Sequence, residues 1–115
     1  MPKNILVIDD EELIVRSLTK LLEKNGYMAL VAKNGKDALE MADIEDFDLI
    51  IADIRMPGIN GVETLELIYE NCQKKKHKKI PAIFITGYAD RELEKQARTL
   101  NPVSYVYKPF DIKEL

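Results

Sequence analysis

Residues 49–58 read LIIADIRMPG, in which four apolar residues precede Asp53 and a Pro-Gly pair ends the stretch. Short runs of branched apolar residues that are bounded by turn-formers are typical of buried strands. Aspartate at the end of a strand is often an ordinary turn residue. A buried charge is costly to desolvate, however, so a carboxylate at the tip of a buried strand can also mark a site of chemistry. The rest of the chain decides between these two interpretations.

The composition is that of one globular domain, and we expect a single domain over residues 1–115. The net charge of -3 argues against a nucleic-acid-binding domain. Cys72 is the only cysteine and His77 the only histidine, which excludes an internal disulfide and the usual zinc sites. No apolar run has the length of a membrane span, and the first residues do not resemble a signal peptide. We therefore expect a cytoplasmic protein without membrane insertion.

Apolar runs of strand length alternate with segments of helical spacing. The runs predicted as strands are residues 5–8, 28–32, 49–52, 81–86 and 103–107. Apolar residues recur at helical spacing over residues 14–22, 38–42, 62–72 and 93–100. This alternation predicts an α/β fold, a doubly wound parallel sheet of five strands with helices on both faces. Ligands bind such sheets at the carboxyl ends of the strands.

Two places in this pattern leave alternatives open. The pair Asn34-Gly35 could form a β-hairpin, although the residues after it have the spacing of a helix. Asp111 is a typical N-cap, but the sequence ends at Leu115, about one turn later. We therefore expect a truncated last helix in a piece of a longer protein, with a stand-alone domain as the alternative. Dimerisation is left undecided.

Polar residues stand at the predicted carboxyl ends of four strands, and they are Asp9, Asp10, Asp53, Thr86 and Lys108. Carboxylates on neighbouring strands repel one another unless a cation lies between them, and oxygen ligands suit Mg²⁺. A lysine and a threonine hydroxyl can bind an incoming anion. Such a set suits phosphoryl transfer, in which a carboxylate can itself be the nucleophile. Each residue alone also has an ordinary role as a cap, a turn hydroxyl or a surface charge, so the prediction depends on their convergence.

Four stretches resemble the receiver domain of bacterial two-component response regulators. They are IDDE at 8–11, DIRMPGING at 53–61, ITG at 85–87 and YVYKPF at 105–110. They occur in the family's order over nearly the whole chain. The resemblance implies a flavodoxin-like sheet with strand order 2-1-3-4-5. Asn101-Pro102 stands where a Gly-Ala pair is common in the family, so the entry to the fifth strand is expected to differ.

The resemblance implies a role for each acid of the predicted site. Asp53 would accept a phosphoryl group from a histidine kinase or a histidine phosphotransfer protein. Asp9, Asp10 and Asp53 would hold Mg²⁺, or Mn²⁺ as the alternative metal, with help from the backbone carbonyl of Arg55. An attached output domain is expected, without direct nucleic-acid binding by the receiver itself.

The resemblance also implies a switch beside the acids. Thr86 and Lys108 would bind the phosphoryl oxygens, and the bond between Lys108 and Pro109 would be cis. Tyr105 would move inward when Thr86 is drawn toward the phosphoryl group, which would change the surface of the fourth and fifth strands and the preceding helix. Without the resemblance, Tyr105 is interpreted as packing in an edge strand with its hydroxyl in water.

Arg55 and Tyr88 each stand two residues beyond a site residue. As a hypothesis, these long side chains flank the phosphoryl group, hinder attacking water and slow self-dephosphorylation. The resemblance implies a domain that accepts a phosphoryl group and slowly loses it, and we expect no turnover of external substrates.

Two other functions remain as alternatives. The first is a small phosphohydrolase or a flavin-binding enzyme on a similar fold. A phosphatase with an aspartate nucleophile would need a second acid two residues after Asp53, where this chain has Arg55, and no glycine-rich phosphate loop is present. The other alternative is a pseudo-receiver, an interaction module that is never phosphorylated. Retention of all five predicted site residues argues against it.

Overall fold

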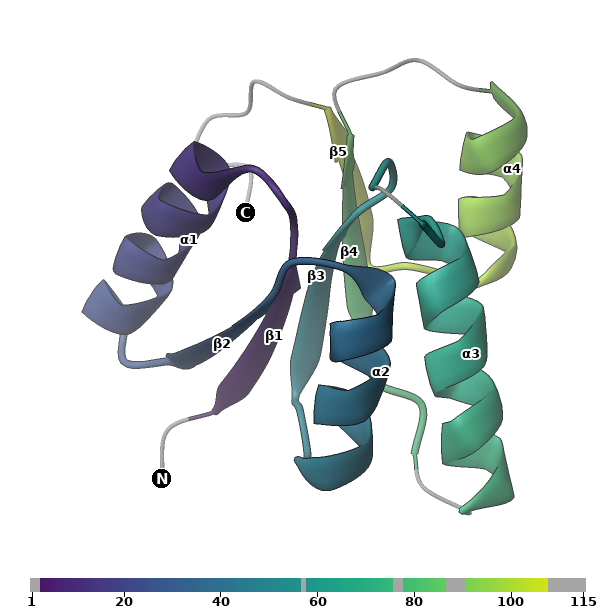
Figure 1. Cartoon of the computed structure of the whole chain (residues 1–115), viewed down its shortest axis with the longest axis horizontal. Helices are drawn as coiled ribbons and strands as arrows, with labels where there is room; N and C mark the ends of the chain where they lie inside the picture. The colour runs from purple at the N-terminus through teal and green to yellow at the C-terminus, as the bar shows by residue number, and fades with distance from the viewer. Residues whose placement is uncertain (1–2, 57, 76–77, 87–90, 108–115) are drawn as a thin grey trace.

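The computed structural model of the chain describes residues 3–56, 58–75, 78–86 and 91–107. The fold consists of strands that alternate strictly with helices (Figure 1). The elements are β1 Asn4–Ile8, α1 Glu12–Lys24, β2 Met28–Ala32, α2 Gly35–Ile44, β3 Leu49–Asp53, α3 Gly61–Lys74, β4 Ala82–Thr86, α4 Arg91–Thr99 and β5 Ser104–Tyr107. The expected truncated helix after Asp111 lies outside the described residues.

The five strands form one parallel sheet in the order β2-β1-β3-β4-β5. This arrangement confirms the predicted doubly wound sheet and its strand order. The three central strands are mostly apolar and covered on both faces: all five residues of β4 are buried, as are four of the five in β1 and in β3. Among the described helices, none is both long and apolar enough to cross a membrane.

Two apolar clusters divide the core between the faces of the sheet. On one face, α1 packs Leu18 against Ile5, Ile51 and Ile83. The larger cluster lies on the other face, where α2, α3 and α4 contribute Ala38, Leu65 and Ala97 among others. Figure 1 shows α1 alone on its side of the sheet and the other three helices on the opposite side. The helices therefore cover both faces, as predicted.

The register of the strands brings their carboxyl ends to one edge. Ile8 at the end of β1 lies opposite Ala52 in β3, so the following residues, Asp9 and Asp53, are neighbours across these strands. Asp53 in turn lies opposite Ile85 of β4, which places Thr86 one residue further along. The register of the strands alone therefore brings Asp9, Asp53 and Thr86 to the same edge of the sheet.

The segment at Asn34-Gly35 is a helix start and not a hairpin. The Asn34 side chain accepts a hydrogen bond of 2.8 Å from the backbone N–H of Asp37, which caps α2. Gly35 packs tightly here, because an added Cβ would lie 2.4 Å from side-chain atoms of Ile59 and Thr64. The helical interpretation of this segment was therefore correct.

Asn101 shows how the chain enters β5 without the glycine that is common there. It has a φ of 53°, in the left-handed region, and its N–H donates to the carbonyl of Arg98 at 3.1 Å. Asparagine tolerates this conformation better than most residues with a side chain. The altered pair therefore ends α4, and Val103 then donates a hydrogen bond of 2.7 Å to the carbonyl of Ala82.

Gly61 is the residue that lets α3 begin directly against the end of β3. A Cβ at this position would lie 2.1 Å from the carbonyl oxygen of Asp53, a backbone atom that cannot move aside cheaply. We expect Gly61→Ala to lower the free energy of unfolding by about 3 kcal/mol, at the upper end of the usual cost of overpacking. Urea denaturation measures this loss.

Gly58 provides the matched control for this substitution. Its φ is +80°, and no atom would lie within 4 Å of an added Cβ, so Gly58→Ala introduces backbone strain without a clash. That strain costs about 1–2 kcal/mol. A Gly61→Ala variant more stable than Gly58→Ala would contradict the proposed close contact.

Candidate functional site

Three acids meet at the carboxyl edge of the sheet. Asp9, Asp10 and Asp53 each place one carboxylate oxygen within 4.8 Å of those of the other two. Asp9 and Asp53 are buried, at 0% and 3% exposure, whereas Asp10 is exposed. Carboxylates held this close repel one another, and burial strengthens the repulsion. The cluster is therefore suited to a cation that can be reached from solvent on the side of Asp10.

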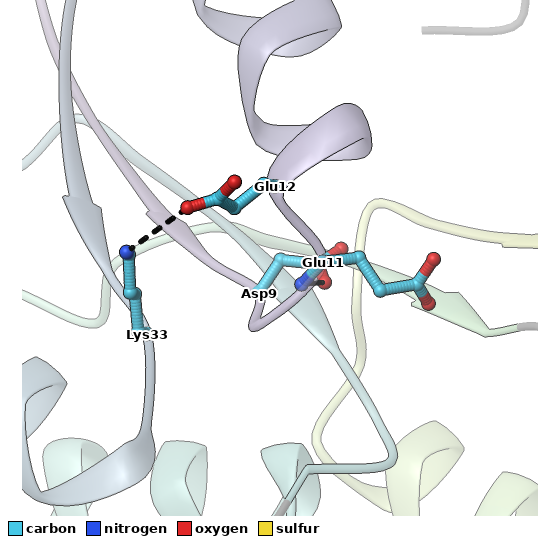
Figure 2. A network of polar contacts seen from close by, with 4 residues as sticks. All are labelled: Asp9, Glu11, Glu12 and Lys33. Atoms are coloured by element: carbon cyan, nitrogen blue, oxygen red, sulfur yellow. Dashed lines mark hydrogen bonds and ion pairs between the residues drawn. The ribbon is translucent and has the colours of Figure 1, made fainter.

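Backbone hydrogen bonds fix Asp9 at the tip of β1. Its N–H donates to the carbonyl of Ala32 at 3.1 Å, which extends the ladder with β2 by one residue. Its Oδ1 accepts a hydrogen bond of 2.9 Å from the backbone N–H of Glu11 (Figure 2). The carboxylate is thus oriented by the turn that leads into α1.

The Glu12 side chain points toward Lys33 and away from the Asp9 carboxylate, as Figure 2 shows. The carboxylate of Glu12 lies 3.7 Å from the Lys33 ammonium, and both side chains are more than 60% exposed. Such an exposed ion pair contributes little to stability. Glu12 therefore serves below as a control acid beside the site.

The loop after Asp53 is closed by hydrogen bonds at both of its ends. The N–H of Ile54 donates to the carbonyl of Ile85 at 3.0 Å, and the carbonyl of Ile54 accepts from Gly61 at 2.8 Å. Asn60 then caps α3: its side chain accepts from the N–H of Glu63, and the Glu63 carboxylate accepts from the N–H of Asn60. This bracing holds the backbone of Asp53 in place while Arg55 stays exposed in the same loop.

Thr86 and Tyr105 lie on the strands beyond Asp53. Thr86 ends β4 and is 1% exposed, while Tyr105 is half-buried in β5 opposite Phe84. Because side chains alternate along a strand, Thr86 shares a face of the sheet with Phe84, and this is the face that α4 covers. Tyr105 lies opposite Phe84, two residues before Thr86, so Thr86 and Tyr105 are diagonal neighbours on adjacent strands.

The remaining predicted residues cannot be placed. Lys108, Pro109 and Tyr88 lie outside the described residues, so the phosphoryl-binding lysine, the cis bond and half of the proposed water barrier stay predictions.

Two groups with a raised pKa lie away from the acids, on the C-terminal half of α3. Burial raises the pKa of Tyr69 to about 12, so its hydroxyl stays protonated and donates to the carbonyl of Ile80 at 2.8 Å. Burial also raises the pKa of the Cys72 thiol, and the nearby Lys75 opposes the shift. Since Ile80 precedes β4, these groups belong to the opposite edge of the sheet.

Two residues with roles around the site were missed in the sequence. In the sequence, Gly61 belongs to an Asn-Gly pair that starts a helix. Its close approach to the Asp53 carbonyl becomes apparent only in the folded structure. Arg98 of α4 places its guanidinium carbon 5.3 Å from the centroid of the Tyr105 ring. The only signal for Arg98 in the sequence is the Glu94–Arg98 spacing typical of a helical ion pair.

Comparison of the chain with known proteins identifies its family and its relatives. A family model described as the response regulator receiver domain matches residues 5–115. The chain is 35% identical over its whole length to the transcriptional regulatory protein CrdR of Helicobacter pylori, of which it covers 52%. The chain spans about half the length of several such curated relatives.

Solved structures show the same fold. A CheY-like receiver domain protein from Methanospirillum hungatei superimposes with a TM-score of 0.88 at 28% identity, over 99% of this chain and 87% of that one. A response regulator from Burkholderia pseudomallei, solved with a phosphorylated aspartic acid, a calcium ion and citrate, gives a TM-score of 0.83 at 29% identity. That match covers 97% of this chain and 63% of the other.

Proposed function

The chain belongs to the response regulator receiver domain family, and from this membership we propose that Asp53 is its phosphoacceptor. Receiver domains are signalling domains that accept a phosphoryl group in two-component systems. The observation that carries the assignment is the burial of Asp53 at a strand tip within 4.8 Å of Asp9 and Asp10 carboxylate oxygens. A relative of the same fold contains a phosphorylated aspartic acid, which supports an aspartate as the acceptor.

The proposed reaction is transfer from a phosphohistidine. A carboxylate oxygen of Asp53 attacks phosphorus, and an O–P bond forms as the P–N bond to the imidazole breaks. The imidazole nitrogen leaves with the electron pair and takes its proton from solvent, so the product is an aspartyl phosphate. Because phosphoryl transfer needs mainly positioning and charge neutralisation, fixing Asp53 between two strands is a substantial part of what the protein contributes.

The acidic cluster fits the divalent metal that receiver domains bind. Three oxygens from separate carboxylates suit a hard cation, and one open side leaves room for water. We propose Mg²⁺, with Mn²⁺ as the alternative, held by Asp9, Asp10, Asp53 and the backbone carbonyl of Arg55. When bound, the metal would neutralise charge on the phosphoryl oxygens.

The switch is proposed from the positions of Thr86 and Tyr105. Thr86 is buried on the strand next to that of Asp53, which supports the proposal that its hydroxyl would bind a phosphoryl oxygen, with Lys108 as its partner from the family pattern. Tyr105 would follow Thr86 inward and change the surface of β4, β5 and α4. Arg55 and Tyr88 would slow the loss of the phosphoryl group.

Membership of the receiver domain family also suggests the partners of this chain. We propose a histidine kinase or a histidine phosphotransfer protein as the donor. Since CrdR is a transcriptional regulatory protein of which this chain spans 52%, we propose that an attached output domain acts on the signal. The cytoplasmic location and the absence of turnover chemistry stay predictions.

Small phosphodonors test this function. The chain is incubated with phosphoramidate, which has the P–N bond of phosphohistidine, or with acetyl phosphate, each with Mg²⁺, and its intact mass is measured. We expect an increase of one phosphoryl group. No adduct with either donor would favour the pseudo-receiver, and steady hydrolysis of p-nitrophenyl phosphate would favour a phosphohydrolase.

A further inference from the structure

Arg98 lies over the ring of Tyr105, at the edge where α4 meets β5. The distance from the guanidinium carbon to the ring centroid is 5.3 Å, within the range of a cation–π contact. The Nε of Arg98 also lies 3.4 Å from the Glu94 carboxylate, one helical turn earlier. Glu94 thus biases the orientation of the long Arg98 side chain that covers the ring.

The packing of α4 explains why the two residues meet. Ala97 is fully buried, and this small side chain lets α4 approach the sheet closely. Tyr105 is half-buried against the same cluster as Leu93 and Leu100. Its ring therefore has one side in the core and one side under the Arg98 guanidinium.

We propose that Arg98, oriented by Glu94, is a positioning residue that holds Tyr105 in its present half-buried position and so opposes the switch. This inference rests on the proposed function, because it assumes that Tyr105 moves inward when Asp53 is phosphorylated. Inward movement takes the ring away from the guanidinium and toward Thr86. The cation–π contact is then present in one state only, and a contact shifts an equilibrium only by its difference between the two states.

The size of the effect follows from the exposure of the pair. The Arg98 side chain is 60% exposed, so the contact has the strength of a surface cation–π interaction. Losing it would change the ratio of inward to outward Tyr105 by about two- to fivefold. The exposed ion pair with Glu94 alone would add little to stability. Arg98 is therefore expected to change the position of Tyr105 while changing the stability of the fold little. A residue with only a structural role would not shift Tyr105 in this way.

Fluorine NMR of the full chain labelled with 3-fluorotyrosine tests the inference directly. The Tyr105 signal is assigned by its loss in Tyr105→Phe. Without phosphodonor, Arg98→Ala is expected to move this signal toward its position in the phosphorylated wild type. Arg98→Lys keeps a cation on the same helix face and should restore part of the wild-type position. Lys95→Ala, which removes an exposed cation from the same helix, should leave the signal unchanged.

The initial rate of phosphorylation by acetyl phosphate gives a second measurement. We expect Arg98→Ala to raise this rate by about two- to fivefold, as expected if the contact opposes the switch. In a Tyr105→Leu background, which has no ring to hold, the same substitution should have no effect.

The outcomes separate the inference from the function on which it rests. If the wild type takes up a phosphoryl group but Arg98→Ala shifts neither the Tyr105 signal nor the rate, the positioning role is wrong and the proposed function stands. If Arg98→Ala raises the rate equally in the Tyr105→Leu background, Arg98 acts on something other than the ring, and the inference is overturned. A wild type without any adduct overturns both.

Discussion

The Asp53→Asn variant is expected to take up no phosphoryl group from acetyl phosphate and Mg²⁺ under conditions in which the wild type acquires one. An amide lacks the anionic oxygen that attacks phosphorus, and no other acid of the cluster occupies the same braced position at the end of β3. Intact mass measures the result. Asp46→Asn is the matched control, because it makes the same change of charge at an exposed residue before β3.

The same variant is expected to be more stable than the wild type in metal-free buffer. Replacing Asp53 removes one of three carboxylates whose oxygens lie within 4.8 Å of one another. We expect a gain in the free energy of unfolding of roughly 1–3 kcal/mol from the relief of this repulsion. Urea denaturation should show the gain for Asp53→Asn and a change within about 0.5 kcal/mol for Asp46→Asn. Equal or lower stability of Asp53→Asn would contradict the repulsive cluster.

The second large effect is expected from the metal and from Asp9. Mg²⁺ at a hundred times its dissociation constant should stabilise the wild type by about 2.7 kcal/mol, since it binds the folded state only. Asp9→Asn removes a buried carboxylate that we propose as a metal ligand, and it should abolish most of this response. We also expect the rate of phosphorylation by acetyl phosphate to fall by about two orders of magnitude in Asp9→Asn, because charge neutralisation by the metal is worth several kcal/mol. Chelation should have the same effect on the wild type.

Glu12→Gln provides the control for this prediction. Glu12 follows the same strand and carries the same charge, but its carboxylate pairs with Lys33 and points away from the Asp9 carboxylate. Its replacement should leave both the response to Mg²⁺ and the rate of phosphorylation unchanged. An Asp9→Asn variant that Mg²⁺ stabilises as strongly as the wild type would show that the metal site lies elsewhere.

The sequence predicted the sheet well because its signals are local. The runs at residues 5–8 and 49–52 are continuously apolar, and this pattern is typical of strands that are covered on both faces. Once the strands are parallel, the acids at their carboxyl ends must meet, so the approach of Asp9 to Asp53 followed from topology. The distance between their carboxylates did not follow, since it depends on the turn that the Glu11 N–H closes.

Features that depend on packing between elements could not be predicted in this way. An Asn-Gly pair such as Asn34-Gly35 occurs both in β-hairpin turns and at helix starts, so the pair alone does not decide between them. The close approach of Gly35 to Ile59 and Thr64 can be recognised only in the folded structure. Arg98 gave the signal of an ordinary surface ion pair. Its position over Tyr105 depends on how closely α4 approaches β5, which in turn depends on the buried Ala97.

The central claim is that Asp53 accepts the phosphoryl group, and locating the adduct tests it most directly. The wild-type chain is treated with acetyl phosphate and Mg²⁺ and then with borohydride, which reduces an acyl phosphate to an alcohol and so marks the acceptor permanently. Peptide mass spectrometry then identifies the modified residue. We predict homoserine at position 53 and unmodified Asp9 and Asp10. A modification at another acid, with position 53 intact, would contradict the assignment.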